Sequence, residues 1–315
     1  MSKTVINFRV DEKVKQQAQQ LANELGVSLS AVINSQLKHL IRTKTLEITT
    51  KPATKSTSSE KNNPVLIKQD DRLRFGYIQY TPELASYWDN FIDWNKRKEG
   101  EKGFFINILK AHKVRTVLDF ACGTGYDSIQ LLDAGLGVKS SDGSLFMLTK
   151  ARINAEDRGL KIDARFCDWR RLQRNFTKKF DAAVCLGNSF CHLFDAGDRV
   201  EVLKQVANLL PKDGVFIIDQ RNFDKVLDKG FSSKHKYVYC GTDADVNVAE
   251  KSDDYLRLVY DVGKLKFEFE IYPIRYTELR ELLKETGFDV ISYGDFKTKF
   301  DKYEPDFFQH MCIKK

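Results

Sequence analysis

The sequence predicts an α/β protein whose larger part is a mostly parallel sheet with helices on both faces. Short apolar strands alternate with amphipathic helices from residue 104 to residue 219, an order that is typical of parallel sheets. After residue 230 the pattern changes to antiparallel strands, in which apolar and charged residues alternate, as in residues 265–271. Residues 1–48 contain one strand pattern and two helix patterns, which indicates a small separate domain.

This N-terminal domain begins with a strand over residues 4–10, whose apolar residues share one face. Two amphipathic helices follow, and Gly26 ends the first of them. One strand has no partner in about 48 residues and cannot cover two apolar helix faces. We therefore expect a homo-oligomer through residues 1–48, in which two strands pair and four helices share one core. This layout resembles the ribbon-helix-helix fold, and the sequence is similar to its antitoxin branch.

The basic excess of the chain belongs to this N-terminal part. Residues 1–70 carry 11 Lys and Arg against 6 Asp and Glu, within a net charge of +7 for the chain. A basic surface indicates a polyanion such as DNA as a candidate partner, although such surfaces are more often only solvated. A paired ribbon would present Asn7 and Arg9, which can both contact base edges. The alternative is a dimerisation domain without a nucleic-acid role.

A polar linker is expected next, since residues 49–64 (TTKPATKSTSSEKNNP) contain no large apolar residue. The predicted domains are therefore residues 1–48, a linker over 49–70, and residues 71–315. No apolar run approaches the length of a membrane span, and the N-terminus lacks the apolar region of a signal peptide. We expect a cytoplasmic protein without a membrane partner.

The six cysteines show no C-x-x-C pair and no cluster with histidines, so we expect no metal site and reduced core thiols. Cys191 and His192 are adjacent in the sequence, but a catalytic dyad needs spatial pairing that adjacency does not provide. A nucleophilic thiol at Cys191 is the minor alternative.

The strongest local signal is DFACGTG (residues 119–125), between a strand at 116–120 and a helix at 126–133. Gly123 and Gly125 would let the backbone approach a ligand closely. A dinucleotide fingerprint needs a further glycine where Ser128 stands, so the loop suits a nucleoside better than NAD. Asp142 ends the next strand, where a carboxylate accepts hydrogen bonds from ribose hydroxyls. A lone G-x-G could also be an ordinary tight turn.

Together with LLPKDG (209–214) before another strand, these features resemble class I S-adenosylmethionine-dependent methyltransferases, with their Rossmann-like sheet. Further segments narrow the resemblance: Trp88 with Arg97, CLGNSFCHL (185–193), DQRNFD (219–224) and, more loosely, YGDF (293–296). This set is similar to the glycine N-methyltransferase and glycine/sarcosine N-methyltransferase family, from about Tyr80 to residue 315.

The resemblance implies S-adenosylmethionine as the cofactor. It implies cofactor contacts by Trp88, Arg97, Gly123, Gly125, Asp142, Asp168, Trp169 and Leu186. Asp142 would hold the ribose, Asp168 and Trp169 would flank the adenine, and Leu186 would use its backbone. Arg97 would pair with the methionine carboxylate, and a shift of one residue in the alignment would give this role to Lys98.

The resemblance further implies that Asn188 and Arg221 bind the carboxylate of a small amino-acid substrate. Arginine suits this role because its planar fork gives two parallel charge-assisted hydrogen bonds; the alternative for Arg221 is a structural ion pair. His192 would line the site or be a hydrogen-bonded core histidine. Tyr80 and Tyr272 match active-site hydroxyls of the family.

The implied reaction is methyl transfer from S-adenosylmethionine to the amine of glycine or sarcosine by in-line displacement. Because the sulfonium is already activated, the protein has to supply orientation, desolvation and removal of the amine's proton. Two alternatives stay open. One is a methyltransferase for another small amine or carboxylate, and the other is a DNA-binding regulator that senses S-adenosylmethionine. Turnover of glycine separates the first reading from the regulator.

Overall fold

The protein is described from a computed structural model. It describes residues 79–80, 82–231, 241, 244–262 and 265–315, together with Lys15, Gln16 and Gln19, which are helical. The chain divides into two units, Met1–Ile67 and Lys68–Lys315, and the second holds nearly all described residues. The remainder of the predicted ribbon-helix-helix domain and the predicted linker lie outside the described residues.

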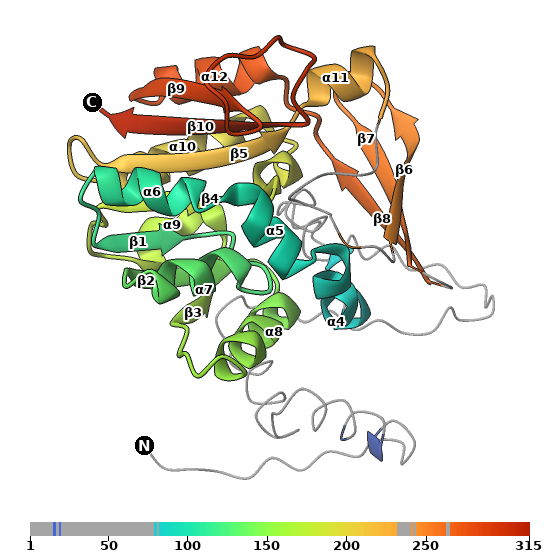
Figure 1. Ribbon diagram of the computed structural model, residues 1–315, viewed down its shortest axis with the longest axis horizontal. Coiled ribbons are helices and arrows are strands. Elements are labelled where there is room, and N and C mark those ends of the chain that lie inside the picture. Colours follow the sequence, from blue (N-terminus) through green and yellow to red (C-terminus); the bar gives the residue numbers. More distant parts are fainter. Residues whose placement is uncertain are drawn as a thin grey trace, which may run out of the picture. The chain divides into compact units, whose positions relative to one another are not determined.

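A seven-stranded sheet with the order β3-β2-β1-β4-β5-β10-β9 forms the centre of the second unit (Figure 1). Its parallel strands are β1 (Thr116–Asp119), β2 (Gly137–Asp142), β3 (Ala164–Phe166), β4 (Ala182–Cys185) and β5 (Val215–Arg221). β10 (Phe307–Lys314) lies antiparallel between β5 and β9 (Phe288–Gly294). The predicted α/β class with a Rossmann-like sheet is confirmed, and part of the antiparallel extension completes this same sheet.

Helices cover both faces of this sheet (Figure 1). They include α6 (Phe104–Ala111), α7 (Tyr126–Asp133), α9 (Leu172–Asn175), α10 (Ala196–Leu209) and α12 (Tyr276–Glu285). Neighbouring strand residues point to opposite faces, so Val117 packs with Phe105 of α6, while Leu118 joins the core under α10 and α12. Each large apolar side chain buried in this way contributes about 1.5–3 kcal/mol to folding.

Three more helices surround the glycine-rich segment: α4 (Pro82–Phe91), α5 (Trp94–Glu101) and α8 (Leu145–Glu156). A polar cluster ties them to that segment. Asp89 of α4 accepts a hydrogen bond from Thr124 Oγ1 at 2.6 Å and another from Asn154 Nδ2 of α8 at 2.9 Å. Asn154 Nδ2 also donates to the carbonyl of Thr124 at 2.9 Å. Helix α4 is therefore fixed to the loop that follows β1.

A second sheet consists of the antiparallel strands β6 (Ala244–Lys251), β7 (Leu256–Val262) and β8 (Leu265–Ile271). Its inner face is apolar, with Leu258, Tyr260 and Phe269 buried in the main core. Its outer face carries charges such as Glu268, which pairs with Arg257 at 3.3 Å. The alternation predicted for residues 265–271 is explained by this one-sided burial.

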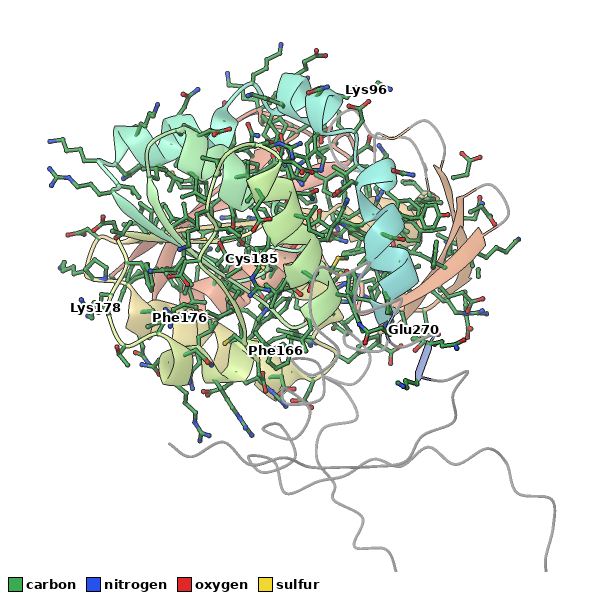
Figure 2. The ribbon with its side chains drawn as sticks, turned by 90° about the horizontal axis from the view of Figure 1, so that it is seen from below. Lys96, Phe166, Phe176, Lys178, Cys185 and Glu270 are labelled. Atoms are coloured by element: carbon green, nitrogen blue, oxygen red, sulfur yellow. The ribbon has the colours of Figure 1, made fainter. Side chains whose placement is uncertain are left out.

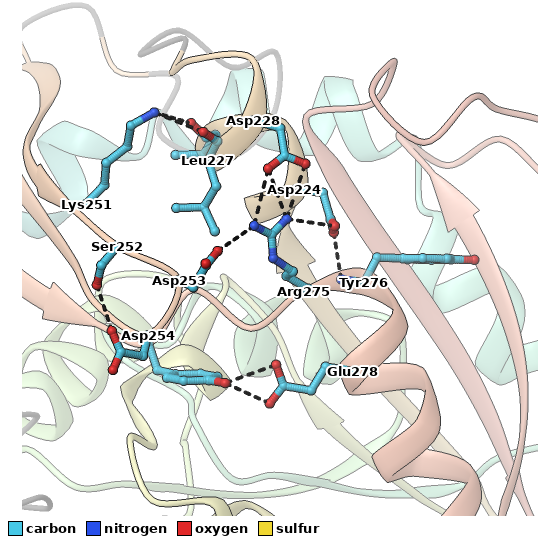
Figure 3. A network of polar contacts seen from close by, with 12 residues as sticks. Asp224, Leu227, Asp228, Lys251, Ser252, Asp253, Asp254, Arg275, Tyr276 and Glu278 are labelled. Carbon is cyan, nitrogen blue, oxygen red and sulfur yellow. Dashed lines mark hydrogen bonds and ion pairs between the residues drawn. The ribbon is translucent and has the colours of Figure 1, made fainter.

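Figure 3 shows the polar network that links this second sheet to two helices. Arg275, directly before α12, contacts Asp224 at 3.3 Å and Asp228 at 3.2 Å, both on α11 (Phe223–Asp228). It also pairs at 2.7 Å with Asp253, in the turn between β6 and β7. Asp224 is fully buried and accepts the backbone N–H of Tyr276 at 2.8 Å. One arginine therefore joins three segments that are distant in sequence.

Cysteines Cys122, Cys167, Cys185, Cys191 and Cys312 are buried and form no disulfide, as expected for core thiols. Figure 2 shows Cys185 in the interior and Lys178 at the rim of the molecule. Within the described ranges, no helix is both long enough and apolar enough to cross a membrane.

Candidate active site

A cavity lies at the carboxyl ends of β1, β2, β3 and β4, where open α/β sheets bind their ligands. It brings together most of the predicted site residues: Tyr80, Trp88, Arg97, Gly123, Asp142, Asp168, Trp169, Leu186 and His192. Lys98 is exposed and does not line this cavity, whereas Arg97 is buried and does. Of the two alternatives for a carboxylate-binding cation, Arg97 is therefore the one that faces the cavity.

The two glycines of the DFACGTG segment have different surroundings. Gly123 has a φ of +52°, and a Cβ added there would meet nothing within 4 Å. Gly125 has a φ of +94°, but its Cβ would contact Ala151 of α8 at 3.1 Å, and Gly125 does not line the cavity. Backbone conformation favours glycine at both positions; Gly123 also leaves open space at the cavity, whereas Gly125 is further required by packing against α8. The expected reason for Gly125 is corrected in this respect.

Ser128, at the place of the missing third glycine, is fully buried in α7. Its Oγ donates to Asp119 Oδ2 at 2.6 Å and lies 2.7 Å from Ser140 Oγ. The serine thus joins the first turn of α7 to β1 and β2.

Asp142 is held by the backbone on both sides. Its Oδ2 accepts the N–H of Gly123 and its Oδ1 the N–H of Ser144, each at 2.8 Å. A carboxylate has about four acceptor sites, so at most about two remain for a ligand. Burial by the surrounding protein raises the pKa of Asp142 to about 6, although the side chain itself is half-open toward the cavity. It is therefore mainly ionised at neutral pH.

The cavity wall next to Asp142 is formed by the segment after β3, where the N–H of Cys167 donates to the carbonyl of Asp142 at 3.1 Å. Asp168 caps the short helix η1 (Trp169–Arg171) by accepting the N–H of Arg170 at 2.9 Å, and its other oxygen pairs with the Arg170 guanidinium at 3.0 Å. Trp169 lines the cavity, and its buried Nε1 makes no hydrogen bond to the residues that the structure describes.

His192 and Tyr80 form a hydrogen-bonded pair on the cavity wall, with Nε2 and Oη 2.9 Å apart. Burial lowers the pKa of His192 to about 4, so the imidazole is neutral at neutral pH. Its Nδ1 is buried and makes no hydrogen bond within the described part of the chain. The Tyr80 ring packs against Trp88, with the centroids 5.5 Å apart, and closes this side of the cavity.

The remaining predicted site residues, Asn188, Arg221 and Tyr272, lie outside the cavity lining. Asn188 precedes η2 (Ser189–His192), and its Oδ1 accepts the backbone N–H of Arg221 at 2.8 Å. Arg221 is 2% exposed, with its guanidinium carbon 4.9 Å from the rings of both Phe231 and Phe307. Asn188 and Arg221 are therefore brought together, at the end of β5.

Tyr272 has its hydroxyl engaged elsewhere. It donates to Glu278, with both carboxylate oxygens within 3.1 Å, and the Arg199 guanidinium lies 3.9 Å from the centre of its ring. Cys191 also makes an internal contact, since its Sγ donates to the carbonyl of Asn188 at 2.8 Å. Burial raises the pKa of this thiol, which disfavours the nucleophilic alternative.

Comparison with known proteins decides the family. The chain is 39% identical over 254 residues to the glycine/sarcosine N-methyltransferase of Aphanothece halophytica, covering 80% of this chain and 95% of that protein. It is 32% identical over 268 residues to human glycine N-methyltransferase, covering 73% of this chain and 90% of the human protein. The chain belongs to the glycine/sarcosine N-methyltransferase family. The resemblance predicted from the sequence is thereby confirmed.

Family models match two parts of the chain, and solved structures share the fold of the larger part. Residues 117–214 match the model of a methyltransferase domain, and residues 3–60 match that of the RelB antitoxin. An S-adenosylmethionine-dependent methyltransferase from Clostridium acetobutylicum superposes with a TM-score of 0.58 at 20% identity, over 74% of this chain and 98% of that one. The PH0226 protein of Pyrococcus horikoshii gives 0.56 at 22% identity, over 74% and 99%. These structures show the shared fold.

For this family member, sequence reasoning missed Glu101 and Asp127, which both contact Arg97 beside the cavity. The position of Asp127 has an ordinary structural explanation, because an acidic residue in the first turn of a helix is common. Glu101 stands four residues after Arg97 on one helix, a spacing that is also typical of surface pairs. Only the tertiary structure shows that the two carboxylates share one buried arginine.

Proposed function

We propose that this chain transfers the methyl group of S-adenosylmethionine to the amine of glycine or sarcosine. The observation that carries the proposal is a single cavity that joins Gly123, Asp142 and Trp169 to Arg97 at one end and His192 at the other. This arrangement offers places for a nucleoside, for an amino-acid tail and for a small acceptor. Relatives at 39% and 41% identity carry the name glycine/sarcosine N-methyltransferase.

S-adenosylmethionine supplies an activated methyl group when it is bound. Asp142 would accept hydrogen bonds from the ribose, Trp169 would flank the adenine, and Arg97 would bind the methionine carboxylate. Trp88 and Tyr80 exclude water from the same cavity. Fixed groups of this kind lower the barrier by orienting the reactants before the chemical step.

His192 has a role that its protonation state defines. Because burial keeps it neutral, it places no positive charge beside a sulfonium. One ring nitrogen of a neutral imidazole accepts a hydrogen bond and the other donates. The Nε2 atom is engaged with Tyr80, and this hydrogen bond fixes the orientation of the imidazole on the cavity wall.

The carboxylate of the amino-acid substrate is assigned to Asn188 and Arg221. Asn188 Oδ1 is used by the backbone of Arg221, which leaves the amide nitrogen for a ligand and fixes its direction. The Arg221 guanidinium supplies the charge.

Methyl transfer from radiolabelled S-adenosylmethionine to glycine, sarcosine and dimethylglycine tests the proposal. We expect transfer to glycine, to sarcosine or to both. Turnover of neither, with intact binding of S-adenosylhomocysteine, would leave a methyltransferase for another small amine or carboxylate, or a sensor of the nucleoside.

For the N-terminal part, the RelB antitoxin match over residues 3–60 and the basic charge favour a second function. We propose that residues 1–48 make the protein a dimer and bind DNA. Light scattering of the full chain and of residues 71–315 tests the first point, and a monomeric full chain contradicts it. Gel shift with the DNA upstream of the coding region, at low and moderate salt, tests the second. Binding that is absent, or is unchanged by Asn7→Ala with Arg9→Ala, leaves a dimerisation domain only.

A further inference from the structure

Two carboxylates of the chain itself, those of Glu101 and Asp127, pair with the positive charge of Arg97. Its Nε lies 2.6 Å from Glu101 Oε1, and its Nη2 lies 2.9 Å from Asp127 Oδ1 and 3.0 Å from Asp127 Oδ2. Its guanidinium carbon stacks 4.1 Å from the centre of the Tyr126 ring. With 2% exposure, the arginine is held on three sides within the protein.

The remaining guanidinium nitrogen of Arg97, Nη1, indicates the role of this arrangement. Nη1 makes no hydrogen bond within the part of the chain that the structure describes. Arg97, Tyr126 and Asp127 all line the cavity, whereas Glu101 does not. Glu101 therefore acts on the cavity only through Arg97 and through Tyr126, whose hydroxyl donates to Glu101 Oε2 at 3.2 Å.

We propose that Glu101 and Asp127 are positioning residues that direct Nη1 of Arg97 at the carboxylate of the methyl donor, and that Glu101 takes up a proton when this carboxylate binds. The inference rests on the proposed function, which assigns that carboxylate to Arg97.

The charge balance explains the proton. The groups that face Glu101 are Arg97 on its own helix and Tyr126 and Asp127 on α7. Burial, opposed by Arg97, raises the pKa of Glu101 to about 7, and burial also raises that of Asp127. A third carboxylate would place three negative groups around one buried guanidinium, which is costly without compensation. Protonation of Glu101 removes one of them and leaves its other oxygen to accept from Arg97 Nε.

Proton uptake by Glu101 makes ligand affinity depend on pH. A bound carboxylate shifts the Glu101 equilibrium toward the protonated form, so a carboxylate-bearing ligand binds with net proton uptake around and above pH 7. Its affinity then falls as the pH rises through this range. A ligand with the same nucleoside but without the amino-acid tail shows neither effect.

Isothermal titration calorimetry of the full chain tests this in buffers of different ionisation enthalpy. The ligands are S-adenosylhomocysteine and 5′-methylthioadenosine, which lacks the amino-acid tail. Near pH 7.5 we expect roughly half a proton taken up with the first ligand and none with the second. Glu101→Gln keeps the hydrogen-bonding shape but cannot titrate, and should lose the uptake while retaining affinity. The ligand's own ammonium group contributes equally to wild type and variant.

Two further variants distinguish a positioning role of Glu101 from a role in protein stability alone. Glu101→Ala should reduce the preference for S-adenosylhomocysteine over 5′-methylthioadenosine by about tenfold, the size expected for a misdirected charge-assisted hydrogen bond. Glu99→Gln removes a carboxylate from an exposed position of the same helix and should change neither quantity. Unchanged proton uptake in Glu101→Gln, or an unchanged preference in Glu101→Ala, overturns the inference.

Arg97→Gln distinguishes this failure from a failure of the proposed function. Loss of the ligand preference in Arg97→Gln, with wild-type behaviour in the Glu101 variants, retains the carboxylate site and rejects the positioning role. An unchanged preference in Arg97→Gln rejects the carboxylate site itself, and with it the inference.

Discussion

The nucleoside end and the amino-acid end of the proposed site are built in different ways. At the nucleoside end, backbone N–H groups of Gly123 and Ser144 fix Asp142, and the glycine leaves open space in front of it. At the amino-acid end, the Asn188 side chain accepts a hydrogen bond from the backbone N–H of Arg221 on β5, and this contact fixes both residues. The first end is set by a short local segment, whereas the second depends on how η2 and β5 meet.

The largest effect is expected from Gly123→Val, which tests the local end. A β-branched residue at a φ of +52° is strained, and its side chain would enter the cavity. We expect the affinity for S-adenosylhomocysteine to fall about a hundredfold or more in calorimetry, as strain and lost space combine. Gly135→Val carries similar strain at a φ of +83° away from the cavity and is the matched control. An equal loss in both variants would assign the effect to folding.

Arg221→Ala tests the other end. Removing the cation should raise the KM for glycine or sarcosine about thirtyfold, in line with about 2 kcal/mol for a buried charge-assisted contact. The affinity for S-adenosylhomocysteine should stay within about threefold, because Arg221 lies outside the nucleoside cavity. Arg221→Lys should restore only part of the loss, since the planar fork is missing. Unchanged amino-acid kinetics in Arg221→Ala would remove it from the substrate site.

The pH dependence of nucleoside binding tests the role of Asp142 at the nucleoside end of the site. Asp142 has its pKa raised to about 6, so acidification below pH 6 protonates it and removes acceptors for the ribose. The affinity for 5′-methylthioadenosine should therefore fall up to about fivefold between pH 6 and pH 5. Asp142→Asn should bind more weakly at pH 7.5 and lose most of this dependence. A wild-type profile in the variant would falsify the assignment of the acid limb to Asp142.

The smallest kinetic effect is expected from Tyr272→Phe. Its hydroxyl is bound to Glu278, so kcat/KM should change by less than about threefold, while the free energy of unfolding falls by about 1 kcal/mol. Urea denaturation measures the second quantity. A kinetic loss comparable to that of Arg221→Ala would instead return Tyr272 to the substrate site.

The same contrast explains what could be predicted from the sequence. Gly123 and Asp142 belong to a strand–loop–helix–strand segment whose geometry is local, so their approach was foreseeable. The helix over residues 126–133 is also found with the predicted bounds, because its caps and apolar face lie within the segment. The partner of Tyr272 depends on the first turn of α12, and the pairing of Arg97 with Asp127 joins residues 30 positions apart. Such contacts leave no periodic trace in the sequence.

The position of β10 has a consequence for synthesis. β9 is made before β10 but pairs only with it within the described residues, and β10 in turn pairs with β5. While the nascent chain emerges, β5 therefore has an open edge, and β9 has no place in the sheet until β10 arrives. Such late, non-local pairing slows folding and leaves apolar strand edges exposed to other chains. Phe307 and Phe308, both fully buried at the start of β10, lose contact with water only when β10 pairs with β5.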